Sequence, residues 1–206
     1  MAPVIDFYRY DGLIFDLDGT LIDSMPFHVR AWQQVCQEHG NFPLDPQFIY
    51  DRGGCSSQNI VSDLGEHGCA VGSIPDFVKR KVELYRAHLN EVPLFPEVFA
   101  ILKKAKERGA LITIGTGTQR QNVIDILQIH NCSHLVDFIV SSDDVTKHKP
   151  DPETYNRSLE LMQLKPEQCI VVEDGLPGIQ AAAAAFIDSV TVANDKIISF
   201  NPAPRA

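Results

Sequence analysis

The chain has 206 residues, 44% hydrophobic and 22% charged, a composition typical of a globular protein with one or two domains. Its 27 Asp and Glu against 18 Lys and Arg give a net charge of -9, which argues against nucleic acid and anionic membranes as partners. An anionic substrate would therefore need a local group of hydrogen-bond donors or a metal ion.

The first predicted element is an apolar strand at residues 12–18, with the sequence GLIFDLD. Asp16 and Asp18 stand at its carboxyl end, where ligands bind in open α/β sheets. Because alternate side chains of an extended chain point the same way, both carboxylates can address one centre, one as nucleophile or metal ligand and the other as acid/base. This motif alone also fits a turn followed by a helix cap.

Residues 24–92 show helical periodicity at 27–40, 56–68 and 75–89 and no convincing strand. This stretch is too long for an ordinary crossover between parallel strands, so we expect an inserted helical domain with linkers marked by Pro26, Pro93 and Pro96. The patch formed by Gly53, Gly54, Ser56 and Ser57 fits either a loop between helices or a substrate contact.

From residue 95 onward, helical segments alternate with short apolar strands expected at 111–115, 137–142, 169–174 and 189–193. This alternation predicts an α/β protein whose parallel sheet is covered by helices on both faces. With the first strand, five strands are expected.

Polar side chains follow the later strands as well. Thr116 and the Gly117 amide come after the second strand, beside a helix that begins near Gln119, and Lys149 follows the third. Glu173 and Asp174 end the fourth strand, where their charges would repel the first carboxylates unless a divalent cation lies between them. Carboxylate oxygens suit Mg²⁺, and a hydroxyl, a lysine, amides and Mg²⁺ together neutralise a transferring phosphoryl group. The predicted reaction class is phosphoryl transfer.

These motifs, in this order, resemble those of the haloacid dehalogenase superfamily: DLDGT from Asp16, Gly115 with Thr116, Lys149 in KPDP, and Glu173 with Asp174. The resemblance covers essentially the whole chain.

The resemblance implies a catalytic set of Asp16, Asp18, Thr116 and Lys149. The same resemblance implies that Asp16 forms an aspartyl-phosphate, and that Asp18 protonates the leaving oxygen and then deprotonates the incoming water. Lys149 bridges nucleophile and phosphate. The resemblance further implies Mg²⁺ held by Asp16, the Asp18 carbonyl, Glu173 and Asp174, a strand order of 5-4-1-2-3, and a cis peptide between Lys149 and Pro150.

The helical insertion resembles the cap of the β-phosphoglucomutase-like branch through His28, Arg30, Ala31 and Trp32. This likeness implies a Rossmann-like core domain at 1–23 and 93–206 and a helical cap domain at 24–92. Substrate contacts are then expected from His28, Trp32, Ser57, Gly117 and Arg120, although Trp32 fits the interior of the cap better.

Departures from the mutase pattern favour one predicted activity over another. That pattern carries an arginine in the cap and a lysine after the second motif, and the aligned residues here are Ser57 and Gln119, with Arg120 as a partial substitute. The segments GTGT and VTKHKPDPETY resemble fructose-1-phosphatases. We expect a Mg²⁺-dependent phosphatase acting on a small sugar phosphate of the fructose-1-phosphate type. The alternatives are a β-phosphoglucomutase-type mutase and a non-catalytic metabolite-binding protein.

Two related activities are disfavoured. The dehalogenase branch lacks the second aspartate that Asp18 supplies here, and a phosphonatase needs a cap lysine, which is not evident near His28.

The five cysteines are widely spaced without a CxxC motif, so neither a disulfide framework nor a zinc site is predicted. The first twelve residues show no basic segment followed by an apolar segment, and no run of about 18 apolar residues occurs, so we expect neither export nor a membrane span. We expect a cytoplasmic monomer whose partner is a small phosphorylated metabolite, and neither nucleic acid nor membrane.

Overall fold

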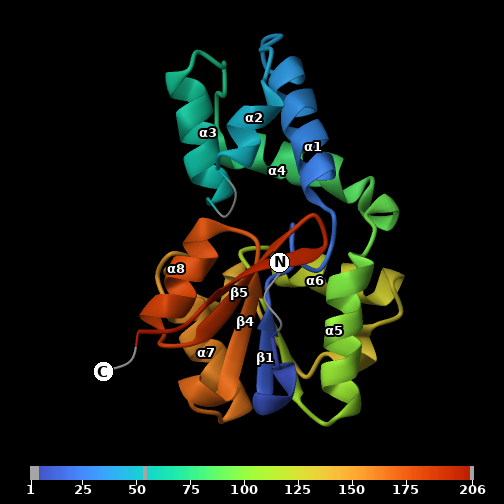
Figure 1. The fold of residues 1–206 in the computed structure, drawn as a ribbon. Helices are drawn as coiled ribbons and strands as arrows, with labels where there is room; N and C mark the ends of the chain where they lie inside the picture. Colours follow the sequence, from blue (N-terminus) through green and yellow to red (C-terminus); the bar gives the residue numbers. More distant parts are fainter. Residues whose placement is uncertain (1–4, 53–54, 205–206) are drawn as a thin grey trace. The chain divides into compact units, whose positions relative to one another are not determined.

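A computed structural model describes residues 5–52 and 55–204 and divides the chain into two compact units (Figure 1). One unit, here the sheet unit, comprises Met1–Asp23 and Pro93–Ala206. The other, here the helical unit, comprises Ser24–Val92. In the described part of the chain, no helix is both long enough and apolar enough to cross a membrane.

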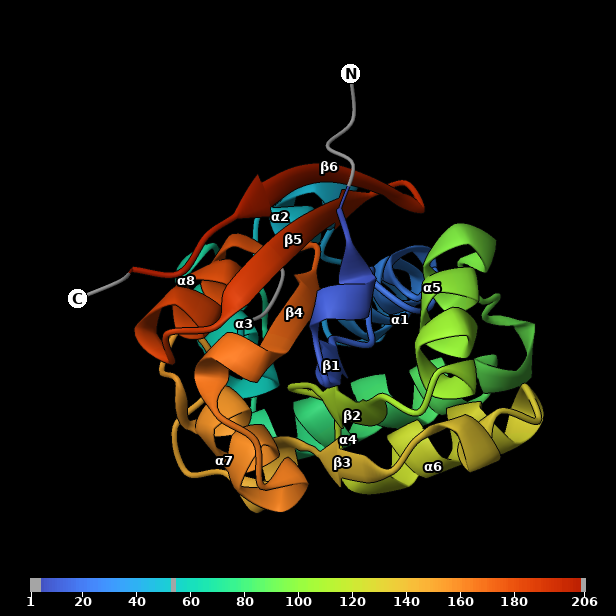
Figure 2. The same ribbon diagram turned by 60° about the horizontal axis from the view of Figure 1, so that its bottom comes forward.

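The sheet unit is built on a six-stranded sheet in the order β3-β2-β1-β4-β5-β6 (Figure 2). Its first five strands are parallel, and the sixth pairs with β5 in the antiparallel sense. The α/β class and the order of the five predicted strands are therefore confirmed, whereas the sixth was not predicted. The strands are β1 (Gly12–Phe15), β2 (Leu111–Gly115), β3 (Phe138–Val140), β4 (Cys169–Glu173), β5 (Asp188–Ala193) and β6 (Lys196–Asn201).

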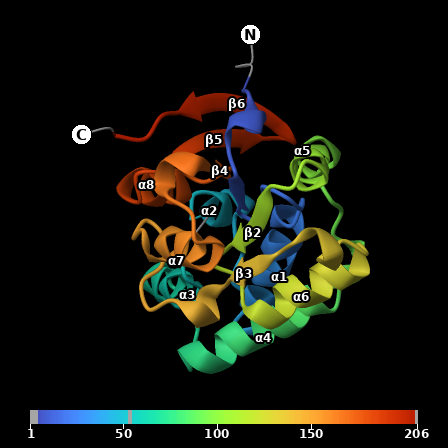
Figure 3. The same cartoon turned by 90° about the horizontal axis from the view of Figure 1, so that it is seen from below.

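Helices cover both faces of this sheet, as the alternation predicts (Figure 3). One face carries α5 (Pro96–Glu107) and α6 (Arg120–Ile129), and the other carries α7 (Glu153–Met162) and α8 (Leu176–Ala184). Every residue of β1 and β4 is buried, as expected of central parallel strands. Short 3-10 helices lie at Phe7–Arg9, Leu89–Glu91, Ser133–Leu135, Ser142–Asp144 and Pro166–Gln168.

The helical unit contains α1 (Met25–Glu38), α2 (Pro46–Tyr50), α3 (Ser57–Glu66) and α4 (Ile74–Arg86). Three of its helices begin at a side-chain cap, since Asp45, Ser56 and Ser73 each accept a hydrogen bond from a backbone amide in the first turn. Its apolar helix faces pack around a core that includes Trp32, Val61, Leu64 and Phe77.

Strand register brings the polar strand ends together. Phe15, the last residue of β1, lies opposite Ile114 of β2 and Val172 of β4. The Asp16 amide continues the ladder by donating to the Val172 carbonyl over 2.9 Å. Because the strands are parallel and end at the same level, the side chains that follow them meet at one edge.

Candidate functional site

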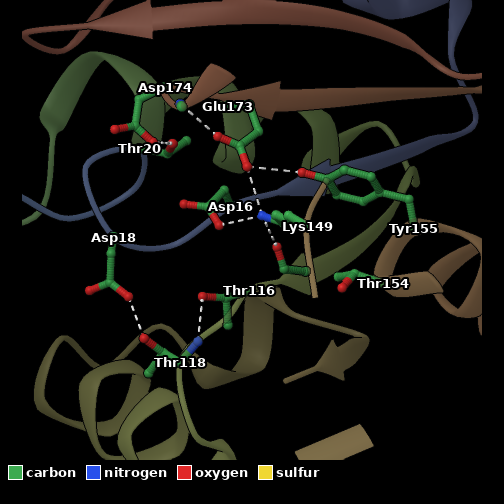
Figure 4. Close-up of polar contacts among 12 residues, drawn as sticks. Asp16, Asp18, Thr20, Thr116, Thr118, Lys149, Thr154, Tyr155, Glu173 and Asp174 are labelled. Carbon is green, nitrogen blue, oxygen red and sulfur yellow. Dashed lines mark hydrogen bonds and ion pairs between the residues drawn. The ribbon is translucent and has the colours of Figure 1, made fainter. Parts of the chain in front are cut away.

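Lys149 lies at the centre of a buried polar cluster (Figure 4). Its Nζ donates to Asp16 Oδ1 and to Glu173 Oε1, each over 2.7 Å, and to the Gly115 carbonyl over 3.0 Å. The side chains of Lys149, Asp16 and Glu173 are 7%, 10% and 4% exposed, so water screens these charges little. The Lys149–Pro150 peptide is cis, as expected.

Burial and charge together raise two pKa values in this cluster. Burial by itself would lower the pKa of Lys149, but the carboxylates of Asp16 and Glu173 outweigh burial and raise it well above its usual range. Burial, with the charges of Glu173 and Asp174, raises the pKa of Asp16 well above its usual range, although Lys149 opposes this. The cluster thus contains one ammonium and three carboxylates, two of which the ammonium contacts, and a further cation would stabilise the ionised forms of the carboxylates.

Glu173 is held on both oxygens. Tyr155 donates from its hydroxyl to Oε1 over 3.0 Å, and the Gly175 amide donates to Oε2 over 2.9 Å. A Cβ atom at Gly178, in α8, would lie 1.6 Å from Oε1, so the helix fits over Glu173 only because that residue is glycine. The sequence offers Tyr155 only as part of a helical period, and its contact with Glu173 was not predicted.

Asp174 is oriented by the β1 loop. The Thr20 hydroxyl donates to Asp174 Oδ1 over 2.9 Å. Gly19 has a φ of 82°, and a Cβ atom there would lie 2.3 Å from Asp174 Oδ2. Burial and the nearby Glu173 charge raise the pKa of Asp174 to about 6.

Three carboxylates are placed to bind a metal ion. Asp16, Glu173 and Asp174 each offer one oxygen, and these atoms all lie within 4.8 Å of one another. An all-oxygen donor set with an excess of negative charge suits Mg²⁺, so the residues present fit the predicted ion.

The second aspartate of the β1 loop points toward the β2 end. Asp18 Oδ2 accepts a hydrogen bond from the Thr118 hydroxyl, a contact that was not predicted (Figure 4). The Thr118 amide in turn donates to Thr116 Oγ1 over 3.1 Å, and Thr116 is 2% exposed. Gly117 is exposed between them, and a Cβ atom there would meet nothing within 4 Å.

Arg120 does not join this cluster. Its guanidinium donates to Asp144 Oδ2 over 2.6 Å and to the Ile139 carbonyl over 2.8 Å. Its amide, at the start of α6, donates to Asp143 Oδ2 over 2.9 Å. Asp144 therefore pairs with the Arg120 cation, and Asp143 accepts a hydrogen bond at the positive N-terminus of α6. The sequence had suggested both features for substrate binding.

His28 lies in a polar and aromatic group of the helical unit. Its Nδ1 is 2.9 Å from Lys81 Nζ, and its ring stacks on Tyr85 with ring centroids 4.0 Å apart. A lysine therefore does lie beside His28, which corrects the sequence argument against a phosphonatase. The partner is 53 residues away in the chain, so only the packing of α1 on α4 brings it there.

Two other predicted substrate residues lie in the same unit. Trp32 is 2% exposed within the core of the helical unit, the position that its sequence context also favours. Ser57 is the first residue of α3 and is half-buried. Of the glycine and serine patch before this helix, Gly53 and Gly54 lie outside the described residues.

Comparisons with known proteins agree with this architecture. A family model described as haloacid dehalogenase-like hydrolase matches residues 13–192. The fructose-1-phosphate phosphatase YqaB of Escherichia coli is 34% identical over 185 residues, covering 89% of this chain and 97% of that protein. A phosphorylated carbohydrates phosphatase of Thermotoga maritima is 28% identical, covering 87% of this chain and 83% of its own.

Among solved structures, a β-phosphoglucomutase of Clostridium difficile superposes with a TM-score of 0.80 at 25% identity, covering 89% of this chain and 85% of that one. The shared fold therefore extends over both the sheet unit and the helical unit.

Proposed function

Because the chain belongs to the haloacid dehalogenase-like hydrolases, we propose that it is a Mg²⁺-dependent phosphatase that hydrolyses a small sugar phosphate of the fructose-1-phosphate type through an aspartyl-phosphate. The observation that carries this proposal is the contact of Lys149 with both Asp16 and Glu173, beside the carboxylate of Asp174. This arrangement offers a nucleophile whose charge is balanced, at an edge able to hold a cation.

In the first step, Asp16 attacks the phosphorus through Oδ2, because Lys149 holds the other carboxylate oxygen. The bond between phosphorus and the sugar oxygen breaks as the Asp16 ester bond forms. Asp18, in its acid form, gives its proton to the departing sugar oxygen.

In the second step, Asp18 as a carboxylate takes a proton from water while the water oxygen attacks phosphorus. The bond between phosphorus and Asp16 breaks, and inorganic phosphate leaves with the aspartate regenerated. The Thr116 hydroxyl, the Gly117 amide and the Lys149 ammonium are assigned to the phosphoryl oxygens, whose charge they stabilise.

The carboxylates of Asp16, Glu173 and Asp174 and the carbonyl of Asp18 are assigned to Mg²⁺. When bound, the ion neutralises charge on the phosphoryl group and on the three carboxylates. Glu173 already accepts hydrogen bonds on both oxygens, so it has the least capacity left for a metal.

Residues 24–92 are proposed to act as a cap that selects the substrate, since the motif carboxylates all lie outside this range. His28 and Ser57 are its proposed contacts. Trp32, by contrast, lies in the core of the helical unit.

The hydrolase is favoured over the mutase by the electrostatics of the second motif. A mutase must hold a second phosphate, and the position after this motif is Gln119, followed by an Arg120 already paired with Asp144. A non-catalytic binder is disfavoured because binding alone needs neither a nucleophile nor an acid/base pair.

The test is a phosphate-release screen over sugar phosphates with and without Mg²⁺, alongside an assay for isomerisation of β-glucose 1-phosphate. We expect Mg²⁺-dependent phosphate release and no isomerisation. Asp16→Asn should abolish release while keeping the fold, and Asp11→Asn, at the exposed opposite end of β1, serves as the matched control. Isomerisation without net phosphate release would support the mutase instead, and no turnover would support the binder.

A further inference from the structure

The loop after β2 supplies a contact to the acid/base aspartate that none of the sequence motifs assigns. Thr118 donates from its hydroxyl to Asp18 Oδ2, and both residues belong to the sheet unit. Figure 4 shows the Asp18 carboxylate directed toward Thr118, while Asp16 is directed toward Lys149. The two aspartates of one loop are therefore held by different partners.

Thr118 is itself fixed by the neighbouring Thr116. Its amide donates to the buried Thr116 Oγ1 over 3.1 Å, and the Thr116 amide donates to the Val140 carbonyl over 2.9 Å. The contact from Thr118 to Asp18 is thus linked to the ends of β2 and β3 through the hydroxyl and the amide of Thr116. An aspartate has two free side-chain torsions, and an anchored donor on one carboxylate oxygen restricts both.

We propose that Thr118 is a positioning residue for proton transfer by Asp18. Its hydroxyl holds the Asp18 carboxyl group where that group can reach the leaving oxygen. Thr118 influences the reaction only through Asp18. This inference rests on the proposed function, because it assumes that Asp18 is the acid that protonates the leaving group.

The distinguishing readout is the dependence of rate on the leaving group. A phenol that is a strong acid leaves without a proton, whereas a weakly acidic one needs the general acid. In a series of substituted phenyl phosphates, the need for a proton on the leaving group changes from one substrate to the next. These substrates have no sugar hydroxyl groups, so a change in sugar recognition cannot produce the same dependence of rate on the leaving group. The slope of log kcat/KM against the pKa of the leaving phenol measures the proton transfer.

Thr118→Val removes the hydroxyl and keeps the shape of the side chain. We expect kcat/KM for phenyl phosphate to fall about tenfold more than kcat/KM for 4-nitrophenyl phosphate, which steepens the slope. Thr118→Ser retains the donor and should restore the wild-type slope. In a background of Asp18→Asn, Thr118→Val should add no further loss, because its effect passes through Asp18.

The inference is overturned if the valine variant loses rate equally across the series, gains rate, or is unchanged, or if serine fails to restore the slope. An equal rise of KM across the series would assign Thr118 to phosphate binding instead. If the valine variant does not fold, as judged by circular dichroism, Thr118→Ala answers the same question. Failure of the wild-type protein to release phosphate from any substrate would instead reject the proposed function.

Discussion

At the level of single residues, Lys149 shows most clearly how the sequence motifs relate to the proposed chemistry. The strand-end positions predicted that it would lie with Asp16, and the structure adds that it also binds Glu173. The contacts of Tyr155, Thr20 and Thr118 were not predictable, because a hydroxyl shows no periodicity or spacing that reveals its partner. Arg120 was expected to contact the substrate as a partial substitute for the mutase lysine. Its pairing with Asp144, 24 residues further along the chain, was not predicted.

Removing the lysine should leave two buried carboxylates without their cation. We expect Lys149→Met to lower the free energy of unfolding of the metal-free protein by about 3 to 5 kcal/mol, as for other broken buried ion pairs. Urea denaturation measures this directly. Lys106→Met, which breaks an ion pair with Asp137 nearer the surface, is the control and should cost at most about 1 kcal/mol. Equal losses in the two variants would contradict the buried cluster.

Metal affinity should depend on pH through Asp174, whose pKa is raised to about 6. Below that pH the carboxyl is protonated and must release its proton to bind Mg²⁺, so affinity should weaken by up to about tenfold per pH unit. Calorimetric titration of Mg²⁺ at about pH 5 and about pH 7.5 measures the change and the proton released. Thr20→Val removes a donor to the carboxylate and should move the loss of affinity to higher pH. Affinity independent of pH would disprove the assignment.

At the level of elements, long periodic segments were predicted best. The strand expected at 111–115 is β2, Leu111–Gly115, and the helices expected at 27–40, 56–68 and 75–89 match α1, α3 and α4 within a few residues of their ends. Among the described α-helices and strands, α2 and β6 were missed, for identifiable reasons. The five residues of α2 make little more than one turn, too short for a helical period. β6 is an edge strand whose residues are all partly or fully exposed, after a turn at Asn194 and Asp195, unlike the fully buried central strands β1 and β4.

The placement of α8 over Glu173 depends on Gly178. A Cβ atom at that position would lie 1.6 Å from Glu173 Oε1, so Gly178→Ala should displace the carboxylate or the helix. We expect at least a tenfold loss of kcat/KM and a lower melting temperature, measured by phosphate release and calorimetry. Gly65→Ala, within α3, is the control. A Cβ atom at Gly65 would lie 3.4 Å from the Val71 side chain, which is an ordinary van der Waals contact. If the two variants behave alike, the close approach at Gly178 is unimportant.

Over the whole molecule, the net charge of -9 opposes an anionic substrate. The composition predicted this opposition, and the resemblance of the motifs to a known family implied the strand order. The contacts of Lys149 with two buried carboxylates required the structure. Under the proposed function, a substrate opposed by this charge would be attracted by short-range donors and a bound cation.

Salt should therefore increase the efficiency of the enzyme. Raising NaCl from about 10 to about 150 mM shortens the screening length from about 30 to about 8 Å, which weakens long-range repulsion more than contacts inside the site. We expect kcat/KM for a sugar phosphate at saturating Mg²⁺ to rise about twofold, with KCl giving the same result. A fall in kcat/KM with salt would show that a local positive field controls substrate entry.

Covalent capture of phosphate by Asp16 is the central claim, and it can be measured directly. The enzyme is mixed with its sugar phosphate and Mg²⁺, quenched in acid within one turnover, and reduced with borohydride, which converts an aspartyl-phosphate to homoserine. Mass spectrometry should then find homoserine at position 16 in the wild-type protein and not in Asp16→Asn, which should also lose phosphate release. Phosphate release by the wild-type enzyme without any label at Asp16, or retention of a tenth of the rate by the asparagine variant without deamidation, would contradict the covalent mechanism.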